Sequence, residues 1–388
     1  MQTGASRTRQ TAGYFGAHVA LGLMSAVLGP TLPALAAHVG SDPEALGLLF
    51  MVRALGYMLA SLLVGRVYDR RPAHPVMVGA LIFIALGLGA VPLMPSRATL
   101  VALTLAMGLA QGVLDVGNNM SLSRIHGAGV APYMNALHCS FGVGALIAPL
   151  VVGAVGDLNW SYWALALAMI PAMSWLAATP SPSLESHESR ESADSKSRDS
   201  GSRTLVWLLV IWLLFCQGAE STFGGWIYTV AVGAGFSEVE AARLVAGFWG
   251  AFTVGRLLAI PVAARLRPRT LLSLDIVGGG GAIAVLLAVT RPGTAPSLVI
   301  WAATLGLGVS LASLFPGTLS LVNRRLGLDG AVASKLFVGA SVGSMVMPWV
   351  AGYSLGVELR GPLWLVLGNL LAAGVIMVIV GKSGTARD

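Results

Sequence analysis

The stretch Gly65-Arg66-Val67-Tyr68-Asp69-Arg70-Arg71-Pro72, residues 65–72, begins at the end of the apolar segment 45–68 and stops before the apolar segment 74–95. Each apolar segment is long enough to cross a hydrocarbon layer about 30 Å thick, which takes roughly 20 helical residues. The charged stretch is therefore predicted to be a short loop that joins two transmembrane helices at one membrane surface.

The same alternation of apolar segments and short polar loops continues along the whole chain. Of its 388 residues, 55% are apolar and 11% are charged, whereas soluble domains have about 25% charged residues. A soluble globule is excluded, and an all-α polytopic membrane protein is predicted. Twelve spans are expected, at residues 12–36, 45–68, 74–95, 98–123, 131–155, 160–179, 204–232, 239–264, 270–290, 296–322, 331–355 and 361–381.

The basic residues are distributed unevenly between the two sets of loops. Most of the 24 Lys and Arg residues lie at the chain ends or in residues 65–71, 124, 190–203, 265–269 and 324–335. Positively charged loops face the cytoplasm, so both termini are expected there, in a plasma or bacterial inner membrane. Because this placement accounts for the net charge of +7, a lipid bilayer is the expected partner and nucleic acid is not.

A serine-rich segment divides the chain near its midpoint, which predicts an N-terminal six-helix half (1–179), a cytoplasmic linker (180–203) and a C-terminal six-helix half (204–388). A shift of 199 residues superposes Gly144, Pro149 and Gly153 on Gly343, Pro348 and Gly352. Two six-helix pseudo-repeats around a central site are typical of secondary transporters. The glycines are expected to pack helices closely, or to allow a gating bend at either proline.

The loop 65–72 resembles the G-x-x-x-D-R sequence that joins the second and third helices in the major facilitator superfamily. Gly65, Asp69 and Arg70 match it, whereas Pro72 replaces a second glycine. The resemblance implies a cytoplasmic latch in the outward-facing state. Asp69 is then expected to pair with Arg124 or with the positive end of the helix 331–355. Alternatively, the charged loop only sets the topology.

The span 98–123 carries a stripe of polar side chains. Gln111, Asp115, Asn118 and Asn119 lie on one helix face by their spacing. Ionisable groups inside a membrane usually face the bundle interior and have a function. We expect the three amides to bind a solute and Asp115 to couple an ion. The alternative is that the stripe only links neighbouring helices by hydrogen bonds.

Asn135 and His138 continue this polar set in the span 131–155. The residues from Asp115 to Pro149 resemble the fucose permease group of the superfamily, in which Asp115, Asn118 and Asn135 match. The resemblance implies proton or sugar coupling at Asp115. His138 is a candidate solute ligand, although buried imidazoles are often only structural.

The span 204–232 contains Gln217, Glu220, Gly224-Gly225 and Trp226. The glycine pair is predicted to interrupt the helix beside a cavity. A carboxylate, amides and an indole are typical of sugar sites, because carboxylates and amides bind hydroxyls and a ring stacks on the sugar. Trp226 as packing or as an interface anchor is the alternative.

The sequences around Glu220, residues 53–57 and residues 248–256, which include Trp249, resemble the sodium-dependent glucose transporter branch of the superfamily. The resemblance implies a sugar taken up with sodium, with Trp249 near the solute, but no cluster matches a sodium site residue by residue. Arg53 and Arg256 lie deep in their spans, and we expect them to balance the charges of Asp115 and Glu220. Which acid meets which base is left open.

The sequence therefore predicts a monomeric secondary transporter that moves a sugar-like polar solute by alternating access, with Na⁺ or H⁺ as the coupling ion. No other cofactor and no metal site are expected. A drug/proton antiporter of the same superfamily is the nearest alternative. An intramembrane lipid-modifying enzyme is less favoured, because no nucleophile–base pair or metal-binding acid cluster is present.

Overall fold

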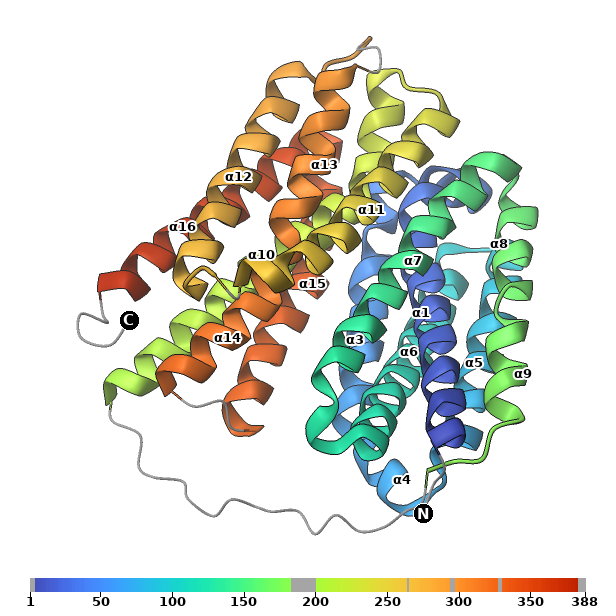
Figure 1. The fold of residues 1–388 in the computed structure, drawn as a ribbon. Helices are drawn as coiled ribbons and strands as arrows, with labels where there is room; N and C mark the ends of the chain where they lie inside the picture. The colour runs from blue at the N-terminus through green and yellow to red at the C-terminus, as the bar shows by residue number, and fades with distance from the viewer. Residues whose placement is uncertain (1–3, 183–199, 264, 294–296, 327–329, 383–388) are drawn as a thin grey trace.

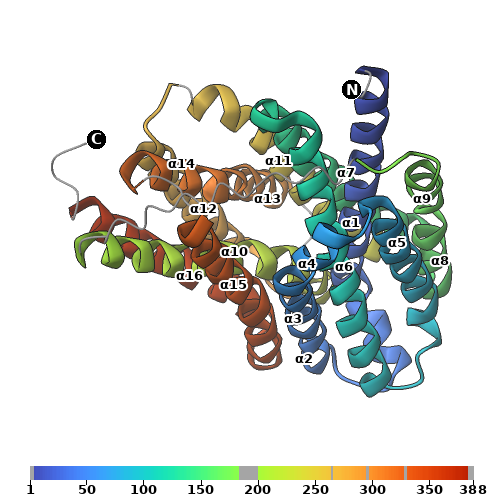
Figure 2. The ribbon, with the colours of Figure 1, turned by 90° about the horizontal axis from the view of Figure 1, so that it is seen from below.

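The computed structural model describes residues 4–182, 200–263, 265–293, 297–326 and 330–382, and the described residues form two helical bundles (Figure 1). Seen from below, the bundles lie beside one another with their helices grouped by half (Figure 2). The first bundle contains α1 (Gly4–His38), α2 (Pro43–Leu46), α3 (Leu48–Leu63), α4 (Gly65–Arg70), α5 (Ala73–Ala90), α6 (Arg97–His126), α7 (Ala131–Val155), α8 (Leu158–Leu167) and α9 (Ile170–Ala177). The second contains α10 (Ser200–Ala234), α11 (Glu238–Ala263), α12 (Pro268–Val289), α13 (Leu298–Ala312), α14 (Leu314–Leu326), α15 (Gly330–Val357) and α16 (Gly361–Lys382).

Within the described ranges, eleven helical segments are long and apolar enough to cross a membrane. The sixth expected span, 160–179, corresponds to α8 and α9, which are too short individually. They are separated at Ala168 and Met169, and Pro171 occupies the first turn of α9. Proline has no backbone N–H to donate to the preceding turn, which favours this interruption. The other expected segments are present, but the tenth is interrupted at Ser313, between α13 and α14, and the first helix begins at Gly4, well before the expected residue 12.

The charged stretch 65–72 was predicted as a loop, but residues 65–70 form the helix α4. It continues from α3 after a change of direction at Val64, and the chain becomes extended at Arg71. Arg71 precedes Pro72, and a residue before proline disfavours the helical conformation. The turn therefore begins later than expected. We call the membrane surface at α4 the basic face.

Close helix contacts through glycine recur in both halves. A Cβ atom at Gly144 would collide with the backbone of α1 at Val19, and a Cβ at Gly343 would collide with the backbone of α10 at Leu214. The two glycines are the pair that the 199-residue shift superposes. The same small-residue contact thus joins the first and fifth spans of each half. Of the two roles predicted for these glycines, this contact corresponds to close helix packing.

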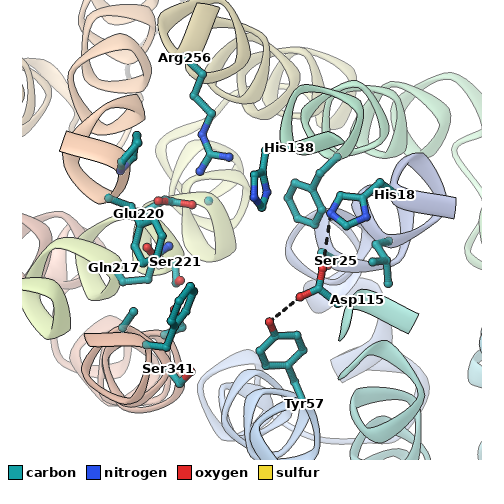
Figure 3. A pocket seen from close by; sticks show the side chains of 18 of the residues that line it. His18, Ser25, Tyr57, Asp115, His138, Gln217, Glu220, Ser221, Arg256 and Ser341 are labelled. Carbon is teal, nitrogen blue, oxygen red and sulfur yellow. Dashed lines mark hydrogen bonds and ion pairs between the residues drawn. The ribbon is translucent and has the colours of Figure 1, made fainter. Parts of the chain in front are cut away.

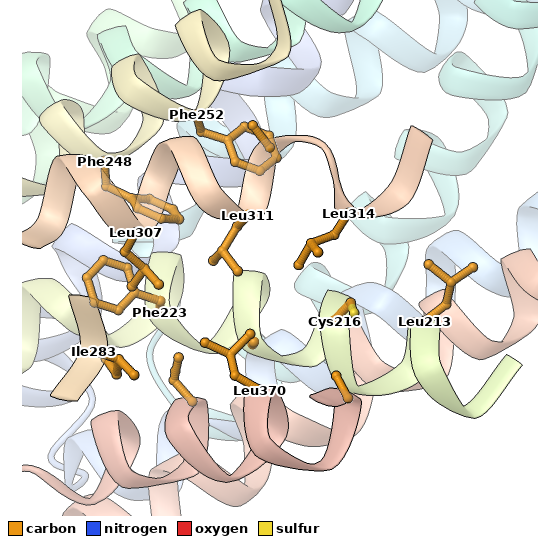
Figure 4. Packing of buried hydrophobic residues seen from close by; sticks show 14 of the residues in the cluster. Leu213, Cys216, Phe223, Phe248, Phe252, Ile283, Leu307, Leu311, Leu314 and Leu370 are labelled. Carbon is orange, nitrogen blue, oxygen red and sulfur yellow. The ribbon is translucent and has the colours of Figure 1, made fainter. Parts of the chain in front are cut away.

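Each half has its own apolar core. Figure 4 shows the core of the second half, where Phe223 of α10 and Phe248 of α11 have ring centroids 4.8 Å apart, beside Leu307 of α13 and Leu370 of α16. The core of the first half is built mainly from α1, α3, α5, α6, α7 and α8, and Trp226 of α10 and Ala351 of α15 are the second-half residues that join it. Because the cores are almost separate, the halves can tilt against each other while each keeps its own packing.

The halves touch at the surface opposite the basic face. A Cβ at Gly352 of α15 would lie 2.6 Å from the carbonyl oxygen of Glu44 in α2, and one at Gly153 of α7 would lie 2.7 Å from the methyl group of Ala242 in α11. Both contacts involve helix ends at that surface. The first half and the second half are therefore closed against each other there.

We predict that Gly144→Ala destabilises the protein. Alanine favours a helix by up to about 1 kcal/mol over glycine, but here its methyl group overlaps α1, and overpacking typically costs about 1–3 kcal/mol. Gly79→Ala is the control, because Gly79 is exposed in the middle of α5 with no atom near an added Cβ. Thermal unfolding in detergent should give a lower Tm for Gly144→Ala than for Gly79→Ala; the reverse order would contradict the described contact.

Candidate functional site

A cavity of about 1050 Å³ lies between the two halves, at the upper end of the range for small-molecule sites. Its wall comes from α1, α3, α6 and α7 of the first half and mainly from α10, α11, α14 and α15 of the second. At one end it reaches Met134 in the first turn of α7 and Ala263 at the end of α11; at the other it stops near Gly29 and Phe50. The cavity therefore opens towards the basic face and is closed on the opposite side.

Asp115 projects from α6 into this cavity and is held by three side chains (Figure 3). The Tyr57 hydroxyl donates a hydrogen bond to Asp115 Oδ2 at 2.7 Å, and Asn119 Nδ2 donates to Oδ1 at 3.1 Å. His18 Nε2 lies 3.4 Å from Oδ1. The polar stripe on α6 was predicted, whereas its partners on α1 and α3 were not.

His18 is the principal site residue that the sequence analysis missed. It lies on α1 and is buried, and its Nδ1 is 2.9 Å from Asn118 Nδ2. Its ring also meets the edge of the His138 ring, with centroids 5.8 Å apart. The available signal was a histidine within the apolar segment 12–36, but nothing in that segment indicated which neighbouring helix it would contact.

The wall contributed by the second half is also polar. Glu220, Gln217 and Ser221 of α10 and Ser341 of α15 face the cavity from the side opposite Asp115 (Figure 3). Arg256 enters from α11 and points between Glu220 and His138 (Figure 3). Hydrogen-bonding groups therefore converge on one space from both halves.

The expectation that arginines pair with the deep acids is wrong for Asp115, whose charged-type contact is with His18. Among the described residues, no carboxylate lies within 4.0 Å of the guanidinium of Arg53 or Arg256. Arg256 instead lies over the Phe252 ring, 4.5 Å from its centroid. Both arginines line the cavity, where water can solvate their charges. A dry interior would leave these charges unsolvated.

Two predicted solute ligands do not line the cavity. Trp226 is fully buried, donates from Nε1 to the Pro348 carbonyl oxygen at 2.8 Å, and packs on Phe50. Asn118 is fully buried and faces His18. Trp226 is thus a packing residue, which was the alternative role predicted for it. Phe50 lies between Trp226 and the cavity. Asn118 supports His18 instead of facing solute.

The predicted interruption at Gly224-Gly225 is absent, since α10 is continuous from Ser200 to Ala234. A Cβ at Gly224 would lie 2.6 Å from the Trp249 ring, and one at Gly225 would lie 3.0 Å from the Phe50 ring. The pair makes room for two aromatic rings, and no break is needed for that.

The remaining predicted ligands lie on the cavity wall: Gln111, Asn119, Asn135, His138 and Trp249. Gln111 Nε2 donates to Ser25 Oγ on α1 at 3.1 Å. Trp249 Nε1 is buried without a hydrogen-bond partner. The cavity wall therefore presents the ring of Trp249 and not its N–H group.

The expected latch residues lie at the basic face. Asp69 Oδ1 is 3.7 Å from Arg124 Nη2, and Arg124 also donates to the Tyr68 carbonyl oxygen at 3.3 Å. Arg124 was one of the two partners predicted for Asp69. Gly65 and Arg70 belong to the same helix, α4. The contact ties the α3–α5 turn to the end of α6, within the first half.

We predict that Cys139 reports the open side of the cavity. Cys139 lines the cavity and is partly exposed, whereas Cys216 is buried in the core of the second half. A charged, membrane-impermeant maleimide should label the protein from the basic face and not from the other. Cys139→Ser should then remain unlabelled; labelling from the opposite face alone would contradict the described opening.

Three comparisons relate this chain to known proteins. It is 29% identical to the human sodium-dependent glucose transporter 1, covering 94% of this chain and 78% of that protein. It is 28% identical to the mouse sodium-dependent glucose transporter 1A, covering 96% of each.

Solved structures share the fold. One is the nucleoside transporter NupG, as a point mutant (TM-score 0.77, 13% identity, 97% of this chain and 99% of that one). Another is a bacterial homologue of the human lysosomal transporter Spinster (TM-score 0.74, 12% identity, 98% and 97%).

The family model for the Major Facilitator Superfamily matches residues 14–348. Together with the all-helical fold and the eleven apolar segments within the described residues, this match establishes the class. The relatives are small-molecule transporters and not enzymes, which sets aside the lipid-modifying enzyme considered above. The chain belongs to the Major Facilitator Superfamily and is a multi-pass membrane transporter.

Proposed function

We propose that this protein is a secondary transporter of a sugar-like polar solute, coupled to Na⁺ or H⁺. The observation that carries the proposal is the cavity between the halves, where carboxylates and amides face one another from α6 and α10. A solute in this space contacts both halves at once, as alternating access requires.

The chemistry of the wall favours hydroxyl groups as solute partners. Glu220 and Gln217 offer acceptors and donors from one side, and Gln111 and Asn135 offer amides from the other. Trp249 adds an aromatic ring. Polyhydroxylated solutes use both functions, through hydrogen bonds and through stacking of their apolar face. The relatives named as glucose transporters support the same substrate class.

Coupling is assigned to Asp115. Its carboxylate faces the cavity and has no arginine or lysine within 4.0 Å among the described residues. A carboxylate in that position gains free energy from binding a cation, and the ion can bias the conformational equilibrium if the two conformations bind it unequally. We propose that Glu220 and Arg256 also take part in coupling, as two opposite charges that face each other across the cavity without a close contact.

The described state is proposed to be inward-facing. The basic face carries the loops that the positive-inside rule assigns to the cytoplasm, and the cavity opens there. The outward-facing state must close this side, and we propose that Asp69 and Arg124 participate in that closure.

The same cavity wall disfavours the drug/proton antiporter. A lipophilic cation, the substrate expected of such an antiporter, would leave the amides of this wall without hydrogen-bond partners.

Uptake into proteoliposomes tests the proposal. We expect one or more sugars from a panel of neutral hexoses, pentoses and sugar acids to accumulate when a sodium or a proton gradient is imposed separately. Liposomes without protein and liposomes with both gradients collapsed are the controls. Accumulation of lipophilic cations, with every sugar inactive, would overturn the substrate assignment in favour of the antiporter.

We predict that Glu220→Gln weakens solute binding by about tenfold or more. A hydrogen bond to a charged group contributes about 1.5–3 kcal/mol, and about 1.4 kcal/mol corresponds to tenfold in affinity. The concentration that half-saturates exchange measures the effect. Glu240→Gln is the matched control, because Glu240 bonds Ser237 at the start of α11, away from the cavity. Equal half-saturation in Glu220→Gln and the unmodified protein would remove Glu220 from the solute site.

A further inference from the structure

We propose that His18 and Asp115 together form a proton-binding site, so that the coupling ion of the proposed transport is H⁺ and His18 is one of its ligands. This inference rests on the proposed function, and it selects between the two ions left open above. The observation behind it is that the N–H groups of Asn119 and His18 and the O–H group of Tyr57 point at the Asp115 carboxylate.

Asn119 directs a hydrogen at the carboxylate. Its Nδ2 contacts both the Asp115 carbonyl oxygen, at 2.9 Å, and Asp115 Oδ1, at 3.1 Å. A backbone carbonyl can only accept a hydrogen bond, so this contact fixes which end of the Asn119 amide is the NH₂ group. The Tyr57 hydroxyl donates to the other oxygen, Oδ2.

The contact of His18 with Asn118 orients its protons. Asn118 Nδ2 lies 2.9 Å from His18 Nδ1, so Nδ1 accepts a hydrogen and the neutral ring carries its own hydrogen on Nε2. Nε2 is the atom that lies 3.4 Å from Asp115 Oδ1. The tautomer set by Asn118 thus turns a third hydrogen towards the carboxylate.

A metal cation does not suit this arrangement. Hard cations take oxygen ligands, whereas the groups next to Oδ1 are the N–H groups of Asn119 and His18. Their hydrogens would point at the ion. The hydroxyl of Tyr57 is the neighbouring side-chain oxygen, and it already donates to Oδ2. A proton needs no ligand shell, and the imidazole can take one on Nδ1 while its Nε2–H group stays directed at the carboxylate.

Asn118 is placed to stabilise the proton-loaded pair. Its Oδ1 is buried and has no hydrogen-bond partner. When the pair takes one proton from cavity water, His18 carries hydrogen on both ring nitrogens and Asp115 stays ionised. A half-turn of the Asn118 amide then presents Oδ1 to the new Nδ1–H group. The charge of the pair changes from −1 to 0, and no bond in the solute is made or broken.

The surroundings connect this charge change to the other half. The titratable and charged groups that face the pair are Tyr57 on α3, His138 on α7 and, across the cavity, Arg256 on α11 and Glu220 on α10 (Figure 3). Arg256 and Glu220 belong to the second half, and Arg256 is the cation of the two. The unloaded pair attracts Arg256 across the cavity, and the loaded pair does not. Proton binding therefore changes the interaction between the halves, which is what coupling requires.

The test replaces His18 by Gln in proteoliposomes, with the most active sugar of the panel as solute. We expect the accumulation ratio driven by a proton gradient to fall to about 1, the value without coupling, while exchange of labelled for unlabelled sugar continues. Accumulation should be retained in a control variant that changes a histidine outside the cavity. His74→Gln controls for the loss of a buried histidine, since His74 bonds Tyr14 and Thr179 away from the cavity.

A measurement on the unmodified protein needs no variant to fold and no solute. Nitrogen-15 spectra of histidine-labelled protein, with His18 assigned from its absence in His18→Gln, should show a neutral ring with hydrogen on Nε2 at high pH that gains a proton as the pH falls. Asp115→Asn should abolish that step or move it, because the carboxylate is what stabilises the imidazolium ion.

Three results would overturn the proton site. They are a sodium gradient as the only driving force, unchanged proton-driven accumulation in His18→Gln, and a neutral His18 at every pH at which the protein stays folded. If no sugar is exchanged by the unmodified protein, the proposed function fails instead, and the spectra still decide whether His18 and Asp115 bind a proton.

Discussion

An ionisable side chain is unfavourable in a hydrocarbon layer unless water or a partner reaches it, and this constraint determines the interior of the protein. Asp115, Glu220, Arg53 and Arg256 all lie along apolar spans, and all four line the cavity between the halves. The cavity gives these groups access to water. The lipid-facing surfaces around it, such as those of α5 and α12, expose large apolar side chains instead.

The two halves repeat the same framework but differ in how they hold charge. Gly144 and Gly343 make equivalent helix contacts, so the first and fifth spans of each half pack alike. In the first half the central acid, Asp115, is enclosed by donors from α1, α3 and its own helix. In the second half Glu220 faces the open cavity and Arg256. The proposed roles, ion coupling on one side and solute binding on the other, follow this difference.

The fold was largely predictable from the sequence, because span length and hydropathy are local properties. The expected segments match the helices, and the missed details are local interruptions. Some lie at proline or beside it, as in α8–α9 and at Arg71, and others, at Val64 and Ser313, do not. The site was predictable only in part. The stripe on α6 follows from helical spacing alone, whereas its partners Tyr57 and His18 depend on which helices become neighbours. The helix break predicted at Gly224-Gly225 was wrong, because a glycine pair suits both a helix break and a close aromatic contact. Only the positions of Trp249 and Phe50, which the sequence does not give, distinguish the two.

The closed side of the cavity is formed mainly where backbone meets backbone or ring. Gly29 approaches the Gly225 carbonyl oxygen, Gly352 approaches that of Glu44, and the Trp226 ring of the second half packs on Phe50 of the first. Separating these surfaces breaks no ion pair among the described residues, but it withdraws the Trp226 ring from Phe50. The barrier to opening this side should therefore arise mainly from exposing a mostly apolar seam and the buried Trp226 ring, and it should respond more to the lipid and water that enter the seam than to ionic strength.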